Sequence, residues 1–228
     1  MGDNMESGVK IEKLIKKGAE ASLFFGYWFG KKALFKHRLP KSYRIEALDK
    51  DIRKVRTLNE AKALIKLKAY GVNVPQVFEI NLESAIITMK FIEGEKLKDL
   101  MNSLNSSDKL NIFKDIGRQI AILHINGHIH GDITTSNMIV TQEGDVFLID
   151  FGLHDYSDKI EDKSVDLHLL KRVLISSHGN DYESCYAAFL KGYEAEYKNQ
   201  KNEVYSDIIK NINVIETRGR YVNKKERN

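Results

Sequence analysis

Three side chains that carry oxygen ligands stand close together in the sequence, among some of its most apolar residues. Asp132 and Asn137 lie five residues apart in the stretch IHGDITTSN, and Asp150 ends the stretch VFLID thirteen residues beyond Asn137. Phosphoryl transfer requires a divalent cation on oxygen ligands, a cation on the phosphates and an acceptor for the proton of the nucleophile. We therefore expect Asp132 to orient an attacking hydroxyl, and Asn137 and Asp150 to hold the metal.

The composition is that of an ordinary globular chain. Its 228 residues are 30% charged and 42% hydrophobic, with a formal net charge of +4, which is too polar for a membrane protein. No run approaches the roughly 20 apolar residues of a membrane helix, and the first residues lack the apolar core of a signal peptide. We expect a cytoplasmic protein without membrane contact. The single cysteine, Cys185, shares a helical pattern with Tyr182 and Phe189, which indicates a buried, inert thiol.

Residues 1–91 predict a β-rich lobe with one long helix. Alternating apolar and polar residues from Val9 to Leu39 indicate about three antiparallel strands, separated by turns at Lys17-Gly18 and Gly30-Lys31. A helix is expected over residues 51–69. Its apolar stripe consists of Ile52, Val55, Leu58, Ala61, Leu64 and Ile65. The stretches PQVFEI and SAIITMKFI then predict a hairpin.

Residues 92–228 predict a mainly helical lobe. One helix is expected to start at Ser106 or Ser107 and to stop at Gly127. Its apolar face consists of Leu110, Phe113, Ile116, Ile120 and Leu123. The stretches NMIV and DVFLID predict a short hairpin that delivers Asp150 at its end. Beyond Ser164 the pattern is helical almost to the basic final stretch, ETRGRYVNKKERN.

Two motifs and their order resemble those of protein kinases. His130-Gly131-Asp132…Asn137 resembles the catalytic-loop signature His-Arg-Asp…Asn, and Asp150-Phe151-Gly152 resembles the Asp-Phe-Gly signature. The resemblance implies an α+β, bilobal kinase-like fold that uses ATP and Mg²⁺. It also implies that Asp132 is catalytic and that Asn137 and Asp150 bind the metal.

Supporting residues follow from the same resemblance. His130 and Gly152 are expected to brace the catalytic loop and the metal-binding loop. Asp166, on the first helix after Asp-Phe-Gly, is expected to fix the catalytic loop by hydrogen bonds. The resemblance therefore implies structural roles, rather than catalytic ones, for these three residues.

The nucleotide side of the site is implied by a second set of residues. The stretch ALFK resembles the lysine strand of kinases, so Lys36 is the candidate for binding the first two phosphates. Its ion-pair partner would be Glu60, at the edge of the packed face of the helix. The other candidates for nucleotide binding are Gly18, Met89 and Phe91.

The chain also departs from ordinary protein kinases. Glu20 lies in a loop that has three glycines in most kinases, so an acid is expected near the phosphates. Gly131 replaces the arginine that usually receives an activation-loop phosphate, which argues against that form of control. Only thirteen residues separate Gly152 from Asp166, and no Ala-Pro-Glu sequence occurs. We expect a truncated activation segment without a platform for peptide docking.

Further stretches resemble the small atypical kinase of the KEOPS (EKC) complex, the Bud-site-selection kinase family. They are KKGAEASL, KHRLPKSYR, RTLNEAKALIKLKAYGVNVPQVF, HGDITTSNMIV, VFLIDFGL and DKSVDLHLLKRVLISSH. The resemblance implies serine/threonine autophosphorylation or ATP hydrolysis. It also implies two partners, the threonylcarbamoyl-transferase subunit and a small regulatory subunit. Together they would support formation of threonylcarbamoyladenosine (t6A) at position 37 of tRNA.

The basic C-terminal tail has two interpretations. Arg218, Arg220, Lys224 and Lys225 could contact tRNA phosphates through charge. The alternative is a frayed basic terminus without a partner.

Other functions are also open at this point. A small-molecule kinase of the aminoglycoside or choline type also carries His-Gly-Asp…Asn, but such enzymes commonly have a histidine where this chain has Thr134. A RIO-type kinase is disfavoured, because the phosphate loop lacks that group's Ser-Thr-Gly-Lys character. The chain could also be a mainly non-catalytic binding module of the complex. The spacing of His124, His128 and His154 does not predict a zinc site.

Overall fold

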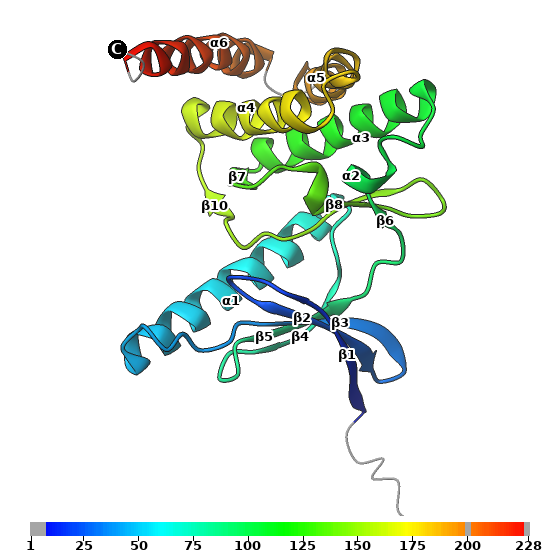
Figure 1. Ribbon diagram of the computed structural model, residues 1–228, viewed down its shortest axis with the longest axis vertical. Helices are drawn as coiled ribbons and strands as arrows, with labels where there is room; N and C mark the ends of the chain where they lie inside the picture. Colours follow the sequence, from blue (N-terminus) through cyan, green and yellow to red (C-terminus); the bar gives the residue numbers. More distant parts are fainter. Residues whose placement is uncertain (1–7, 199–201, 226–228) are drawn as a thin grey trace, which may run out of the picture. The chain divides into compact units, whose positions relative to one another are not determined.

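The computed structural model describes the backbone of residues 8–198 and 202–225, and the side chains of residues 8–198 and 203–217. The chain divides into two compact units, drawn with their elements labelled in Figure 1. The described residues within 1–69 and 74–93 form the first unit, and those within 70–73 and 94–228 form the second. The first is built on a sheet and the second mainly on helices, which confirms the expected α+β class.

The first unit contains a five-stranded antiparallel sheet in the order β1-β2-β3-β5-β4 (Figure 1). The strands are β1 (Val9–Lys17), β2 (Ser22–Trp28), β3 (Lys31–His37), β4 (Val77–Asn81) and β5 (Ile86–Lys90). They confirm the three N-terminal strands and the hairpin that the alternating pattern predicts. Lys36 lies opposite Leu23 of β2 and Ile87 of β5. The candidate phosphate-binding lysine is therefore on a central strand.

Helix α1 (Glu46–Ala69) begins earlier than the expected residue 51. Glu46 and Asp49 lie in its first turn, where the helix dipole favours acids. The predicted apolar stripe is wrong in part, because Val55 and Ile65 are 56% and 51% exposed. The buried positions are instead Asp49, Thr57, Glu60, Ala61, Ala63, Leu64 and Leu67. Several of these residues are polar, so the apolar pattern alone misplaces the buried face.

The second unit is organised around helix α3 (Ser106–Ile125), which contacts α5 (Tyr182–Lys198). Helix α4 (Ile160–Ser177) contacts both α5 and α6 (Asn202–Lys225), and it begins before the expected Ser164. Helix α3 starts at Ser106 as predicted, but its N-cap is Asn105, whose side chain accepts the N–H of Asp108. Of its expected apolar face, Leu110 is 39% exposed. The residues of that face that are buried are Phe113, Ile116, Ile120 and Leu123.

Helices α3 and α5 cross with their backbones in contact. A Cβ atom on Gly117 would lie 2.0 Å from the carbonyl oxygen of Phe189, and one on Gly192 would lie 1.9 Å from that of Lys114. Only glycine permits such close approach at these positions. Cys185, also on α5, is fully buried as expected, and burial raises the pKa of its thiol.

Short strands connect the helices of the second unit. They are β6 (Glu95–Lys96), β7 (His128–Ile129), β8 (Met138–Val140), β9 (Val146–Leu148) and β10 (Asp155–Tyr156), with a short helix α2 (Leu97–Leu100) and a 3₁₀ turn at Thr135–Asn137. Strands β8 and β9 form the predicted hairpin, so Asn137 directly precedes it and Asp150 follows it. Strand β10 pairs with β7, which the sequence analysis did not predict. Among the described residues, none of the helices combines the length and the apolar character needed to cross a membrane.

Candidate nucleotide and metal site

In the first unit, Lys36 and Glu60 form a buried ion pair. Lys36 Nζ donates to Glu60 Oε1 at 2.6 Å, and the two side chains are 8% and 2% exposed. The sequence pattern predicted Glu60 at the edge of the packed face of α1. Glu60 lies instead within the buried face. The sheet thus holds one ammonium group in a fixed place beside the helix. This is the arrangement that phosphate binding by a kinase lysine requires.

Two cations hold the loop Gly18–Ala21, which connects β1 and β2. The N–H of Gly18 donates to the carbonyl of Ala21 at 3.0 Å and closes a tight turn. Lys41 donates to the carbonyl oxygen of Ala19, and Arg56 donates to the carboxylate of Glu20. The acid expected near the phosphates is therefore engaged by an arginine of α1.

Met89 and Phe91 lie at the end of β5. Met89 is a buried residue opposite Leu34 of β3 and Val77 of β4. Phe91 follows the strand and meets the ring of Phe25 edge to face, with 5.0 Å between the ring centroids. Both residues pack within the first unit, and their part in nucleotide binding stays a prediction.

In the second unit, Asp132 and Asn137 are joined by hydrogen bonds. Asn137 Nδ2 donates to Asp132 Oδ2 at 2.8 Å and to the carbonyl oxygen of Asp132 at 3.0 Å. Both protons of the amide nitrogen are thereby used. The amide oxygen of Asn137 is consequently turned away from Asp132 and can act as a ligand. The loop holds one carboxylate and one carbonyl-type oxygen in a defined relation.

Asp150 is brought next to this pair by the β8–β9 hairpin. The N–H of Ile149 donates to the carbonyl oxygen of Asn137 at 2.9 Å. Because Asp150 is the next residue, this bond holds its backbone close to that of Asn137. Asp150 is exposed and has a positive φ of 64°, which is uncommon outside glycine. Such strained residues gather at functional sites. Its Oδ1 accepts the N–H of Gly152 at 3.3 Å, which braces the carboxylate.

His130 is a buried imidazole beneath the loop. Burial lowers its pKa, although the nearby carboxylates of Asp166, Asp132 and Asp150 act in the opposite direction. Its ring packs on Phe151 with 4.5 Å between the centroids, and its Nδ1 accepts the N–H of Asp132 at 3.3 Å. A neutral, packed and hydrogen-bonded ring suits a bracing role better than proton transfer.

The carboxylate of Asp166 binds the backbone of the loop at two successive residues. Its Oδ2 accepts the N–H of His130 at 2.8 Å, and its Oδ1 accepts that of Gly131 at 2.9 Å. His124 Nε2 lies 3.2 Å from Oδ2 and adds a third hydrogen bond. Burial alone would raise the pKa of Asp166, but the hydrogen bonds and the neighbouring imidazoles outweigh it, and the pKa is lowered. The ionised carboxylate thus fixes the two residues that precede Asp132.

The donor set fits a hard divalent cation. Asn137 offers an amide oxygen and Asp150 a carboxylate, and Mg²⁺ prefers oxygen ligands of this kind. The neighbouring imidazole of His130 is engaged at Nδ1 by the N–H of Asp132, and its ring packs on Phe151. Asn137 and Asp150 therefore fit the predicted metal site.

Comparison with known proteins identifies the family. The sequence profile of the RIO domain matches residues 32–154. The KEOPS complex subunit Bud32 of Pyrococcus abyssi is 44% identical over 215 residues, which are 92% of this chain and 96% of that protein. The chain belongs to the Bud32 family and carries a RIO domain. This confirms the family resemblance in the sequence and places the chain among atypical kinases and ATPases, a kinase-like group that uses ATP.

Longer relatives contain a second region. Probable bifunctional tRNA threonylcarbamoyladenosine biosynthesis proteins of Methanococcus maripaludis and Methanobrevibacter smithii are 36% and 40% identical, each over 96% of this chain. The chain covers 38% and 39% of their respective lengths. It corresponds to one part of these bifunctional proteins.

One expectation about the family is wrong. The phosphate loop disfavours a RIO-type kinase, yet the RIO-domain profile matches more than half of the Bud32-family chain. The match begins at Lys32, after the loop Gly18–Ala21. The loop is therefore a poor criterion, because the shared features lie in the later strands and in the catalytic segment.

The histidines near the site bond to one another and to neighbouring side chains. His128 Nδ1 lies 2.8 Å from His154 Nε2, and His124 Nδ1 lies 2.8 Å from the hydroxyl of Tyr193. The described residues contain no group of three or more His, Cys, Asp or Glu side chains arranged to hold a metal. Burial is the main reason that the pKa of His154 is lowered to about 4, with His128 acting in the same direction.

The proposed tRNA contacts lie outside the residues whose side chains the structure describes. Arg218, Arg220, Lys224 and Lys225 belong to the last turns of α6. Their role stays a prediction.

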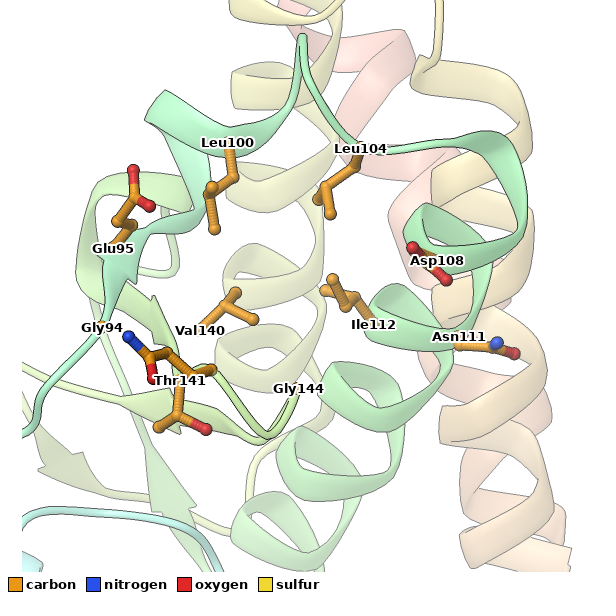
Figure 2. Close-up of a pocket in the computed structure, with 11 residues that line it drawn as sticks. Gly94, Glu95, Leu100, Leu104, Asp108, Asn111, Ile112, Val140, Thr141 and Gly144 are labelled. Atoms are coloured by element: carbon orange, nitrogen blue, oxygen red, sulfur yellow. The ribbon is translucent and has the colours of Figure 1, made fainter.

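A separate cavity of about 570 Å³ lies within the second unit (Figure 2). Its apolar side chains come from α2, α3, β8 and the connection between the two helices, with Leu100, Leu104, Ile112 and Val140 facing one another in the view. Asp132, Asn137 and Asp150 are not among its lining residues. The cavity is thus no part of the candidate phosphoryl-transfer site.

Three residues that hold the candidate nucleotide side were not predicted from the sequence. Arg38 binds Glu60, and Lys41 and Arg56 bind the loop Gly18–Ala21. The stretches KHRLPKSYR and RTLNEA, which contain all three, were recognised only as family features. The available signal was the spacing of Lys36 and Arg38, because alternate residues of a strand share a face.

Proposed function

We propose that the chain transfers or hydrolyses the terminal phosphoryl group of ATP with Mg²⁺, as an atypical serine/threonine kinase and ATPase. The observation that carries this proposal is the hydrogen-bonded pair of Asp132 and Asn137, with the backbone of Asp150 directly beside it. Within one hairpin and its preceding loop, the pair supplies a proton acceptor and an oxygen ligand. These are the parts that phosphoryl transfer requires.

Asp132 is the proposed proton acceptor. Its Oδ2 is held by the amide of Asn137, and Oδ1 can take a proton from a hydroxyl or from water. Asp166 fixes the backbone immediately before it, so the carboxylate is held in one orientation. Orientation of this kind is a main source of rate enhancement in phosphoryl transfer.

Lys36, Asn137 and Asp150 are the proposed nucleotide and metal ligands. Lys36 would bind the phosphates, while Asn137 and Asp150 would hold the cation through oxygen atoms. Bound Mg²⁺ neutralises the charge that develops on the phosphates. Gly18, Met89 and Phe91 remain candidates for contact with the rest of the nucleotide.

The short activation segment favours ATP hydrolysis and autophosphorylation over phosphorylation of a bound peptide. Residues 153–159 alone separate Gly152 from α4, and Asp155–Tyr156 are paired with β7. This part of the described chain therefore offers no extended segment on which a substrate peptide could dock.

We also propose that the chain is the Bud32-type subunit of a KEOPS complex that supports t6A formation on tRNA. Support comes from the name and the 44% identity of the Pyrococcus abyssi relative, and from relatives named for threonylcarbamoyladenosine biosynthesis. The threonylcarbamoyl-transferase subunit and a small regulatory subunit are the proposed partners, working in the cytoplasm. The basic residues Arg218, Arg220, Lys224 and Lys225 are proposed to contact tRNA phosphates.

The direct test is turnover of Mg-ATP by the purified chain. We expect slow hydrolysis or autophosphorylation, abolished in Asp132→Ala and in Asp150→Ala. Asp158→Ala is the matched control, since that side chain is 90% exposed. Unchanged turnover in both site variants would refute the assignment.

Reconstitution distinguishes catalysis from scaffolding. With the transferase subunit, the regulatory subunit and tRNA, we expect Asp150→Ala to abolish the support of t6A formation. Normal t6A formation with Asp150→Ala would instead show that the chain acts in the complex as a non-catalytic binding module. Tight binding of an aminoglycoside or of choline to the isolated chain would favour a small-molecule kinase.

A further inference from the structure

Arg38 reaches the same carboxylate as Lys36 from two residues further along the chain. The N–H of Arg38 donates to the carbonyl of Ala85 at 3.0 Å, so the extended backbone continues past β3. Residues two apart on an extended strand point to the same face. Arg38 Nη2 donates to Glu60 Oε2 at 2.5 Å, while Lys36 Nζ donates to Oε1 at 2.6 Å. Each oxygen of Glu60 therefore has its own cation.

The arginine contacts α1 at two points. Thr57 and Glu60 are three residues apart on the helix, so their side chains are neighbours on one face. Arg38 Nη1 lies 3.4 Å from Thr57 Oγ1, beyond its shorter bond to Glu60. A planar guanidinium bound at two points resists rotation. Arg38 consequently fixes both the position and the orientation of the Glu60 carboxylate.

Stability alone does not account for this buried cluster. Arg38 is 3% exposed and Glu60 is 2% exposed, and buried ion pairs are often replaceable by apolar residues without loss of stability. Arg38 Nε is buried and has no hydrogen-bond partner among the described residues. A buried guanidinium with an unsatisfied donor calls for an explanation other than filling space.

We propose that Arg38 is a positioning residue for Lys36. It holds Glu60 so that the ammonium of Lys36 keeps one direction for phosphate binding. Transfer requires an assembled lysine–glutamate pair, and movement of the helix that carries the glutamate is a common way to break such a pair. Here α1 cannot leave β3 without also breaking the bond between Arg38 and Glu60. Arg38 therefore keeps the pair of Lys36 and Glu60 assembled. This assigns a function to Arg38 within the stretch KHRLPKSYR.

The test compares Arg38→Met with Arg38→Lys, in the wild-type and Glu60→Gln backgrounds. The inference rests on the proposed phosphate-binding role of Lys36. We expect Arg38→Met to lower kcat by about 10- to 100-fold through misplacement of Lys36, with the KM for ATP changed by less than about threefold. Arg38→Lys should restore part of kcat. In the Glu60→Gln background, Arg38→Met should cause little further loss, because Arg38 acts through Glu60.

Arg53→Met is the matched control. Arg53 donates to the buried carboxylate of Asp49 at 2.6 Å. Its Nη1 also lies 3.4 Å from the backbone carbonyl oxygen of Arg38, so the variant removes a long backbone contact but leaves the bond between the Arg38 side chain and Glu60 in place. Arg53→Met should lower the stability of the protein but should not lower kcat as Arg38→Met does. Both variants are assayed well below their melting temperatures. Equal kcat losses in Arg53→Met and Arg38→Met, or additive losses of Arg38→Met and Glu60→Gln, would overturn the inference.

A readout independent of turnover separates this inference from the proposed function. The ¹⁵Nζ signal of Lys36 should be visible by NMR in the wild type, because the ammonium is buried and hydrogen-bonded, and Lys36→Arg assigns it. We expect the signal to broaden or shift in folded Arg38→Met and to persist in Arg53→Met. If the wild type does not turn over ATP but the signal responds in this way, the positioning stands and the proposed function fails. An unchanged signal in folded Arg38→Met overturns the positioning whatever the activity.

Discussion

Replacement of Asp166 is expected to release the catalytic loop. The carboxylate accepts the N–H groups of His130 and Gly131 at 2.8 and 2.9 Å, and His124 Nε2 lies 3.2 Å away. Asp166→Ala leaves two buried backbone donors without an acceptor, each at a cost of about 1–3 kcal/mol. We expect a total loss of about 2–6 kcal/mol, which is a large fraction of the stability of a typical domain.

Asp166→Asn is the more informative variant, because it keeps the shape of the side chain. Its amide has one acceptor oxygen in place of two, so one side must present N–H₂ to a backbone or imidazole donor. We expect a loss of about 2 kcal/mol, together with a fall in ATP turnover as the loop before Asp132 loses its support. Urea unfolding of Asp166→Asn and of the exposed control Asp158→Asn measures the loss of stability. ATP turnover by the folded fraction measures the loss of activity. An Asp166→Asn protein within about 0.5 kcal/mol of the wild type would refute the reasoning.

Three further predictions concern neighbouring features. Gly131→Ala should cost about 2 kcal/mol or more, because Gly131 has φ +79° and an added Cβ would lie 2.3 Å from the carbonyl oxygen of Leu153; urea unfolding tests this, and a stable variant would contradict it. The pKa of His154 is lowered from 6.5 to about 4, so the unfolded chain binds its proton first as the pH falls. Stability should therefore decrease by roughly 1–2 kcal/mol over that interval, after allowance for partial exposure, and His154→Gln should show a smaller decrease in pH-dependent unfolding. Cys185 is fully buried, so Ellman's reagent should react only as fast as the protein unfolds, and immediate labelling in native buffer would contradict this.

Much of the fold follows from local sequence patterns. Alternating residues predicted β1 to β3 and the β4–β5 hairpin, and the apolar pattern predicted α3 from Ser106 onwards. Failures came where polar groups are buried. The buried face of α1 includes Thr57 and Glu60, and their partners come from a distant strand, so no local apolar pattern could reveal it.

The candidate site was less accessible to sequence reasoning. Motif order identified Asp132, Asn137 and Asp150 as candidates, because these residue types recur at fixed places in kinase-like chains. The hydrogen bonds from Asn137 to Asp132 depend on the 3₁₀ turn between them, and only coordinates show which amide atom points where. Arg38 was overlooked because a lone arginine on a basic strand resembles ordinary solvated surface.

The crossing of α3 and α5 links sequence positions far from the chemistry to the geometry of the catalytic loop. Tyr193 follows Gly192 directly, its hydroxyl lies 2.8 Å from His124 Nδ1, and His124 contacts Asp166 through its other ring nitrogen. Burial lowers the pKa of His124 and raises that of Tyr193, so a phenol proton and a neutral imidazole form a directional relay that ends at the loop. Gly192 is not among the candidate nucleotide-binding residues. A methyl group there would nevertheless push α5 away from α3, and would therefore displace the Tyr193 hydroxyl from His124. In this chain, the catalytic loop therefore depends on a place where the backbones of two helices meet without a side chain between them.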